Sequence, residues 1–133
     1  MPNHMTEQHV DSHFIISPTK VTNNSTSYVD VFNQDFQLNH KGIYRIFCFF
    51  EFSTAAATEF IRIRFFASGD KLSDLKMEVP NVNGLSRPCT LHLLTGDLAA
   101  GTHNFTLKFK GETTNAAVSI KNVNCSIERF LRF

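Results

Sequence analysis

With 133 residues, the chain has the length of a single domain, which is enough to bury a sizeable core. Hydrophobic residues make up 42% of the chain, 14 residues are phenylalanine and none is tryptophan. This composition favours packed interiors or apolar interfaces over a sugar-binding platform of stacked Trp or Tyr. The formal net charge of +1, without a basic stripe, argues against nucleic-acid binding. No apolar run reaches the roughly 18–20 residues of a membrane-spanning helix.

The first twelve residues are polar and set the boundary of the predicted domain. We expect residues 1–12 to form an extended arm that a partner orders, and residues 13–133 to form one β-domain. Residues 1–10 lack the apolar core of a signal peptide. Because the three cysteines match no disulfide framework, we expect a protein that is made in reducing cytoplasm.

The most strand-like stretch is Gly42–Phe52, which alternates with a period of two. That period, with β-branched and aromatic residues, predicts a strand rather than a helix. One face is wholly apolar, and the other is apolar in the middle with Arg45 and Glu51 near its ends. We expect a central strand, buried on one face and largely covered on the other. The wholly apolar face consists of Tyr44, Ile46, Cys48, Phe50 and Phe52.

Shorter strands are predicted on both sides of this stretch. Before it, Val21–Ser27 reads as turn-rich and Asn33–Asp35 as a bulge or tight bend. After it, Lys71–Glu78 fits a strand or one helical turn, and we favour the strand. About eight to ten short strands without a clear helix predict an all-β sandwich or barrel. The other expected strands are His13–Ile16, Ser27–Phe32, Phe36–Leu38, Glu59–Ala67, Cys89–Leu94, Thr102–Lys110, Val118–Ile120 and Val123–Phe133.

One face of the strand Glu59–Ala67 carries two arginines between two phenylalanines: Phe60, Arg62, Arg64 and Phe66. This pattern is unusual for a freely solvated face, and we predict that it lies against a neighbouring subunit. The alternative is a solvated face on which the long arginine stems lie over phenylalanine.

The three cysteines, Cys48, Cys89 and Cys125, match neither a zinc site nor a disulfide framework. Each lies in a strand-like run, so we interpret them as buried thiols that act as small hydrophobic residues. One disulfide with one free thiol is the alternative.

No catalytic motif is present: the sequence has no nucleophile elbow, phosphate loop or dinucleotide turn. The six histidines show no metal-ligand spacing, although His92 and His103 could meet across strands. We therefore expect a protein that is not an enzyme and that binds no metal or cofactor.

Three stretches, in this order, resemble a known kind of module. Ser25–Val31 looks like the first core strand of small jelly-roll modules in structural proteins of tailed bacteriophages, and Leu98–Phe109, with its Ala-Gly-Thr-His element, resembles their late strand. Between them, Lys41–Tyr44 is similar to the Gly-x-Tyr strand start of trimeric jelly rolls of the C1q and tumour-necrosis-factor type. The resemblance covers roughly residues 22–133 and implies an antiparallel jelly-roll sandwich.

The resemblance also implies a virion structural role. Such modules serve as capsid cement or decoration proteins, head fibres and tail-fibre tips, and are commonly homotrimers. We favour a decoration protein on the capsid surface, because a compact domain with a polar arm suits docking on a shell. The alternatives are a fibre tip that binds a host receptor or glycan, and a C1q- or cytokine-like trimeric module.

The expected partners are copies of the chain itself and the major capsid protein or another virion protein, with no nucleic acid and no membrane. The arm is our predicted shell contact, through Asn3, His4, Glu7 and His9. Phe60, Arg62, Arg64 and Phe66 are our predicted subunit interface.

Overall fold

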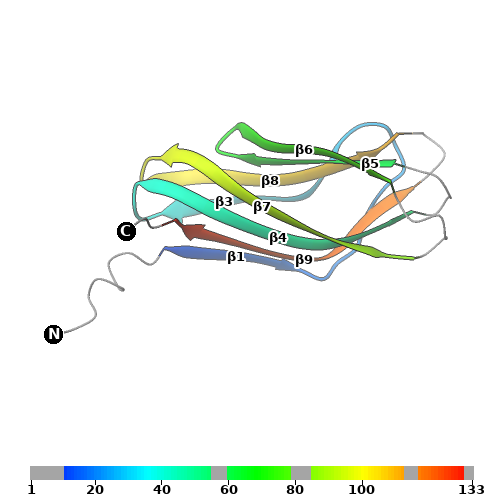
Figure 1. Cartoon of the computed structure of the whole chain (residues 1–133), viewed down its shortest axis with the longest axis horizontal. Coiled ribbons are helices and arrows are strands. Elements are labelled where there is room, and N and C mark those ends of the chain that lie inside the picture. The colour runs from blue at the N-terminus through cyan, green and yellow to red at the C-terminus, as the bar shows by residue number, and fades with distance from the viewer. Residues whose placement is uncertain (1–10, 55–59, 79–84, 113–116, 131–133) are drawn as a thin grey trace.

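The computed structural model describes residues 11–54, 60–78, 85–112 and 117–130, and two antiparallel sheets pack face to face in it (Figure 1). No helix long and apolar enough to cross a membrane occurs in these ranges. The two packed antiparallel sheets confirm the predicted all-β jelly-roll sandwich. Its described strands are β1 (Ser12–Ser17), β2 (Val21–Asn23), β3 (Val29–Leu38), β4 (Gly42–Thr54), β5 (Phe60–Ala67), β6 (Asp70–Glu78), β7 (Arg87–Leu98), β8 (Gly101–Gly111) and β9 (Val118–Arg129).

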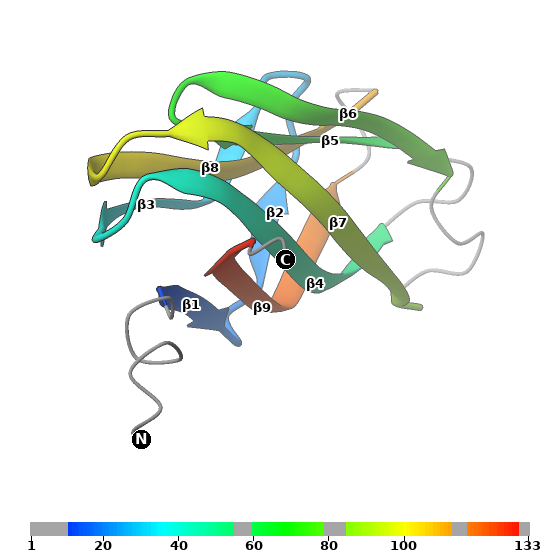
Figure 2. The same ribbon diagram turned by 60° about the vertical axis from the view of Figure 1, so that its left-hand side comes forward.

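The chain crosses repeatedly between the two sheets. One sheet has the order β1-β9-β4-β7, with β2 also paired to β9, and the other has the order β3-β8-β5-β6. Among the described strands, only β5 and β6 are consecutive and pair with each other. β3 is followed by β4, and β7 by β8, in the opposite sheet. Figure 2 shows the two layers from a second side.

β4 occupies the centre of its sheet, between β7 and β9, as its sequence predicts. Its apolar face lies in the core, where Tyr44, Ile46 and Phe50 are fully buried. The expectation that its second face is largely covered is wrong for the single chain. Phe47 and Phe49 are each 38% exposed there, because no element of the described ranges forms a third layer over this sheet.

The core is filled by phenylalanine and β-branched side chains from both sheets. Each fully buried aromatic or aliphatic side chain contributes about 1.5–3 kcal/mol relative to exposure. Phe32 packs edge-on against Phe65, with ring centroids 5.9 Å apart. The largest core residues from the β3-β8-β5-β6 sheet are Leu38, Ile61, Ile63, Phe65, Phe105, Leu107 and Phe109.

β3 differs from its prediction because it is continuous. Residues 33–35 pair in regular register with β8, so the predicted bulge at Asn33–Asp35 is wrong. The irregularity lies between Asp30 and Phe32. An inserted residue there lets Phe32 reach the core while Asp30 points outward.

β2 lies within the stretch that was predicted as turn-rich. Asn23 ends this short strand, and its buried amide donates to the carbonyl oxygens of Ser27 (2.7 Å) and Phe109 (3.1 Å). Its side-chain oxygen also accepts from the backbone N–H of Ser25 at 2.9 Å. The polar residue that signals a turn therefore also joins this turn to the second sheet.

Candidate interaction surfaces

The outer side of the β1-β9-β4-β7 sheet exposes five large apolar side chains, which we call the apolar face: Phe14, Ile16, Phe47, Phe49 and Leu94. Phe14 and Ile16 on β1 are 59% and 71% exposed, and Leu94 on β7 is 50% exposed. Pairing aligns the outward residues in three rows across β1, β9, β4 and β7. These rows are Ser12–Glu128–Arg45–Leu94, Phe14–Ser126–Phe47–His92 and Ile16–Asn124–Phe49–Thr90.

A cation and a histidine border the aromatic centre of the apolar face. The Phe47 ring stacks on His92, with centroids 4.2 Å apart and planes inclined by 16°. The Arg45 guanidinium lies 5.3 Å from the centroid of the same ring and 3.7 Å from Glu128. Ser126 and Asn124 of β9 lie between the apolar side chains of β1 and those of β4, so the face has two apolar groups on one exposed sheet surface. Exposed apolar side chains gathered in this way are typical of a protein–protein contact.

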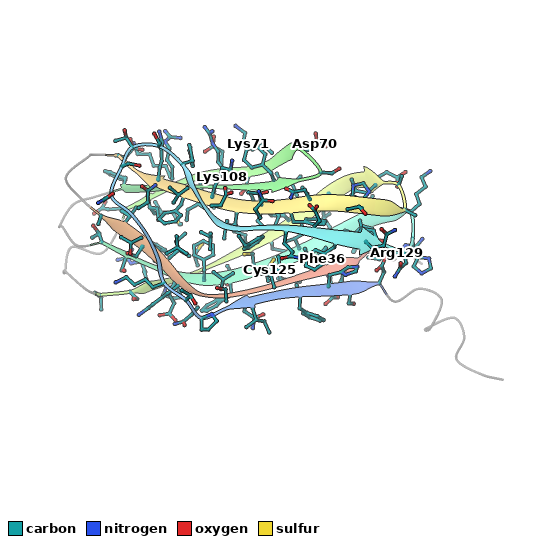
Figure 3. The ribbon with its side chains drawn as sticks, turned by 180° about the vertical axis from the view of Figure 1, so that it is seen from behind. Phe36, Asp70, Lys71, Lys108, Cys125 and Arg129 are labelled. Atoms are coloured by element: carbon teal, nitrogen blue, oxygen red, sulfur yellow. The ribbon has the colours of Figure 1, made fainter. Side chains whose placement is uncertain are left out.

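The outer side of the other sheet is of a different kind, and it contains the predicted interface residues. Phe60, Arg62, Arg64 and Phe66 all point outward from β5, and Phe60 is 37% exposed. Their assignment to a subunit interface stays a prediction. We call this surface the cation–aromatic face; it comprises Arg62, Arg64, Lys71, Lys76, Lys108 and Lys110 with Tyr28, Phe60 and Phe66 (Figure 3 labels Lys71 and Lys108).

The rings of the cation–aromatic face lie beneath its cations. The ammonium of Lys76 lies 4.8 Å from the Phe60 ring centroid, and that of Lys108 lies 5.2 Å from the Phe66 ring centroid. Arg64 lies 4.4 Å over the ring of Tyr28. The sequence alternative placed arginine stems on phenylalanine, whereas the cations over these two phenylalanine rings are lysines.

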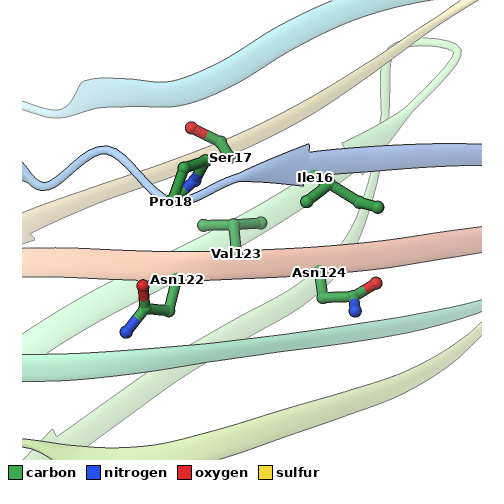
Figure 4. A pocket seen from close by; sticks show the side chains of 6 residues that line it. All are labelled: Ile16, Ser17, Pro18, Asn122, Val123 and Asn124. Atoms are coloured by element: carbon green, nitrogen blue, oxygen red, sulfur yellow. The ribbon is translucent and has the colours of Figure 1, made fainter.

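A small open pocket adjoins the apolar face at the end of β1, with a volume of about 190 Å³ (Figure 4). Asn122 has a φ of 55°, which asparagine tolerates better than most residues, and its amide donates to Glu51 Oε2 at 2.8 Å. Ligand pockets usually measure roughly 300–1,000 Å³, so this hollow suits a single side chain better than a metabolite. Its lining is Ile16, Ser17, Pro18, Asn122, Val123 and Asn124.

Asp11 is the centre of a buried polar cluster at the start of β1. Its carboxylate accepts from the backbone N–H of Asn39 (2.9 Å) and lies 2.8 Å from His13 Nε2. The Tyr44 hydroxyl lies 2.5 Å from Asp11 Oδ2 and 2.6 Å from the His40 carbonyl oxygen, and its one proton can be donated to one of them at a time. The backbone N–H of Arg129 also donates to the Asp11 carbonyl oxygen at 3.0 Å.

The environment of this cluster shifts two pKa values in opposite directions. Burial alone raises the pKa of Asp11, but hydrogen bonds from Tyr44 and Asn39 outweigh it, so the pKa lies below its usual value. Burial and the contact with Asp11 raise the pKa of Tyr44. Because these hydrogen bonds join the start of β1 to the β3–β4 turn, to β4 and to β9, we interpret the cluster as structural.

The cysteines are free thiols. Cys48 and Cys125 lie directly opposite each other on β4 and β9 and are fully buried. The contact with Cys125 and burial raise the pKa of Cys48, and burial raises that of Cys89. The sequence interpretation did not anticipate the adjacency, because the register of β4 and β9 that creates it has no short motif.

The structure separates the two histidines that we considered together. His92 lies on β7 in one sheet, whereas His103 lies on β8 in the other, so the suggestion that they meet across strands is wrong. His103 contacts Ser68 Oγ (2.8 Å) and the Ala99 carbonyl oxygen (2.7 Å). Among the described residues, no group of three or more His, Cys, Asp or Glu could hold a metal ion.

The predicted shell-contact residues Asn3, His4, Glu7 and His9 lie outside the described residues.

No protein-family model and no curated protein matches the chain. Solved structures match in fold at low identity. The C-terminal domain of EclA, a sugar-binding protein, matches with a TM-score of 0.53 and 11% identity over 82% of this chain and 78% of that chain. Eiger TNF from S. frugiperda matches with a TM-score of 0.51 and 9% identity, over 94% and 95%.

Other matched chains are longer. A chain in the structure of infectious bursal disease virus, Gx strain, has a TM-score of 0.52 and 5% identity over 91% of this chain, which spans 36% of the viral chain. The chain likewise spans 13% of latent PorU from Porphyromonas gingivalis, with a TM-score of 0.56 and 11% identity over 94% of this chain. At these identities the likenesses show the fold alone: a jelly-roll β-sandwich.

Proposed function

We propose that the chain is a virion structural protein, most specifically a capsid decoration or cement protein that associates into trimers on the shell. In this proposal it has no catalytic activity, is made in the host cytoplasm and ends on the capsid surface. Its partners are copies of itself and the major capsid protein or another virion protein. Three copies around a three-fold axis form a closed assembly, and several attachment sites make weak single contacts sufficient.

The apolar face is the observation that carries this proposal. A monomer in water leaves Phe14, Ile16, Phe47, Phe49 and Leu94 exposed on one continuous sheet surface. Exposed apolar side chains in such numbers are typical of a surface that binds another protein. The Arg45–Glu128 pair at its edge carries both charges, so each could pair with the opposite charge of a second copy. The resemblance to phage jelly-roll modules supplies the virion setting.

The structure makes the choice of subunit interface testable. Phe47 on the apolar face and Phe60 on the cation–aromatic face are almost equally exposed, at 38% and 37%, so they form a matched pair. We expect Phe47→Ser to raise the concentration of half-association roughly tenfold or more, since burying a phenylalanine stabilises a contact by about 1.5–3 kcal/mol. Phe60→Ser is expected to leave association unchanged. Light scattering over a range of concentrations measures both.

The opposite pattern, with Phe60→Ser alone weakening association, would place the interface at Phe60, Arg62, Arg64 and Phe66 as the sequence predicts. A wild-type chain that stays monomeric at every concentration would contradict free self-association.

The shell role is tested with particles that lack the protein. We expect the purified chain to co-sediment with them at a fixed stoichiometry and to raise the temperature at which they come apart. A chain that binds host cells but not particles would instead support the receptor- or glycan-binding fibre tip. A chain that trimerises but binds neither would leave the C1q- or cytokine-like module.

A further inference from the structure

The cation–aromatic face concentrates positive charge that the linear sequence does not reveal. Strand pairing places Arg62 on β5 directly between Lys76 on β6 and Lys110 on β8. Neighbouring strands lie about 4.8 Å apart, so three cations stand side by side, an arrangement that is unfavourable by itself. The sequence showed no basic stripe because its members come from three separate segments.

Few carboxylates offset this charge, and they are shared. Asp74 Oδ atoms lie 3.7 Å from Arg62, 3.4 Å from Arg64 and 3.2 Å from Lys71. The hydrogen bond from Lys71 lowers the pKa of Asp74, and Arg64 lowers it further against partial burial. Glu112 lies 3.1 Å from Arg62.

Two longer ion pairs also lie on the cation–aromatic face. Glu112 also lies 3.9 Å from Lys76, and Asp30 lies 3.9 Å from Lys108. Among the described residues, five of the six cations, all except Lys110, thus form ion pairs with three carboxylates: Asp30, Asp74 and Glu112. Asp35 and Asp70 lie towards the margins of the face, whereas Glu78 follows Lys76 by two residues on the same side of β6 and adjoins the row. Six cations against Asp30, Asp74, Glu78 and Glu112 leave the face with two more positive than negative charges.

Aromatic rings hold these cations in place without cancelling their charge. The ring of Tyr28 lies under both Arg64 and Lys110, at 4.4 and 5.2 Å, and the ring of Phe60 lies under Lys76. A ring attracts a cation but carries no net charge, so the cation keeps its full charge for an anion. The face is therefore arranged in advance to meet negative charge.

We propose that the cation–aromatic face binds an anionic polysaccharide through the row Lys76, Arg62 and Lys110 and the adjacent Arg64 and Lys108. The surface is an open sheet face, which suits an extended polymer rather than a small molecule. Single-stranded nucleic acids need bare aromatic rings for base stacking, and here cations cover the rings. This inference goes beyond the capsid role and does not depend on it.

The test compares two double variants that remove the same charge. Lys76→Gln with Lys110→Gln removes two members of the row, whereas Lys20→Gln with Lys41→Gln removes two exposed lysines outside this sheet. Binding to heparin is measured over a series of salt concentrations. We expect the first variant to bind about tenfold more weakly, if each lysine loses a contact of the size usual for exposed ion pairs. Its salt dependence should fall by about one unit of slope per lysine, and the control should match the wild type.

Two further probes separate the sources of negative charge. Dextran sulfate carries only sulfate and polygalacturonate only carboxylate, so their relative affinities identify the group that the face prefers. The proposal is overturned if the wild-type chain does not bind any of the three polysaccharides, or if the control variant loses as much affinity as the row variant. Equal or tighter binding of duplex or single-stranded DNA at the same salt would overturn the assignment to a polysaccharide.

Discussion

At the residue scale, Asp11 shows how one buried carboxylate joins the residue before β1 to the turn between β3 and β4. It is 4% exposed and receives donors from the β3–β4 turn and from the β4 side chain Tyr44. A buried acceptor with this many partners is costly to alter, because backbone N–H groups cannot turn away. Sequence reasoning placed Asp11 in the arm, since a polar residue before a short strand carries no sign of burial.

Replacing Asp11 by Asn tests this role. We expect Asp11→Asn to lower the free energy of unfolding at pH 7 by about 1–3 kcal/mol, since the new amide group opposes the N–H groups of Asn39 and His40. Denaturant unfolding measures the change. Asp97→Asn, which removes an exposed carboxylate beside Lys41, is the control and is expected to cost little.

The same carboxylate predicts a pH dependence. Its pKa is lower in the folded chain than the ordinary value near 4, so the charged form stabilises the fold above that pH. This contribution is lost as the pH falls through the folded-state pKa. The unfolding free energy of the wild type should therefore decline below about pH 4 more steeply than that of Asp11→Asn. Parallel curves for the two proteins would contradict the role of Asp11.

The thiols give a second residue-scale prediction. Cys48 and Cys125 are fully buried and Cys89 is partly buried, and burial that raises a thiol pKa suppresses the reactive thiolate. A thiol reagent such as DTNB should modify at most one cysteine in the native chain and all three in denaturant. Cys89→Ser should abolish the native reaction. Rapid native labelling of two or three thiols would contradict the packing of β4 against β9.

At the scale of elements, β4 separates what a sequence pattern can and cannot establish. Its alternation predicts a central strand and identifies the core face correctly, because a period of two directly reports which side chains share a side. The exposure of its second face was missed, since apolar residues there look the same whether a partner layer belongs to this chain or to another. The pattern predicts that Phe47 and Phe49 are covered, whereas both are exposed in the single chain. This difference points to a contact with another chain.

The sequence predicted strands better than it predicted which strands pair with each other. Local signals identified most strands, but the row Lys76–Arg62–Lys110, the contact Cys48–Cys125 and the separation of His92 from His103 all depend on which strands are neighbours. Those neighbours are far apart in sequence, and no turn motif encodes them. Both candidate surfaces are therefore products of topology.

At the scale of the whole molecule, the two sheets give one small domain two unlike outer surfaces. One exposes large apolar side chains on β1, β4 and β7, and the other carries cations over aromatic rings. A symmetric assembly that buries the first surface leaves the second free to face outward. Self-association and polyanion binding can therefore be altered independently, which is why Phe47 and Lys76 are tested with separate readouts.

The N-terminal arm is the predicted contact between the assembled domain and the shell. Deletion of residues 1–9 is expected to abolish binding to particles while leaving thermal unfolding and oligomer mass unchanged. The deletion must stop before Asp11, because removing residues 1–12 would also remove the carboxylate that Tyr44 and Asn39 contact. The longer deletion should therefore lower the unfolding temperature as well. Co-sedimentation with particles measures attachment, and calorimetry measures stability. Full attachment by the chain without residues 1–9 would exclude Asn3, His4, Glu7 and His9 as the shell contact and transfer that role to a folded surface.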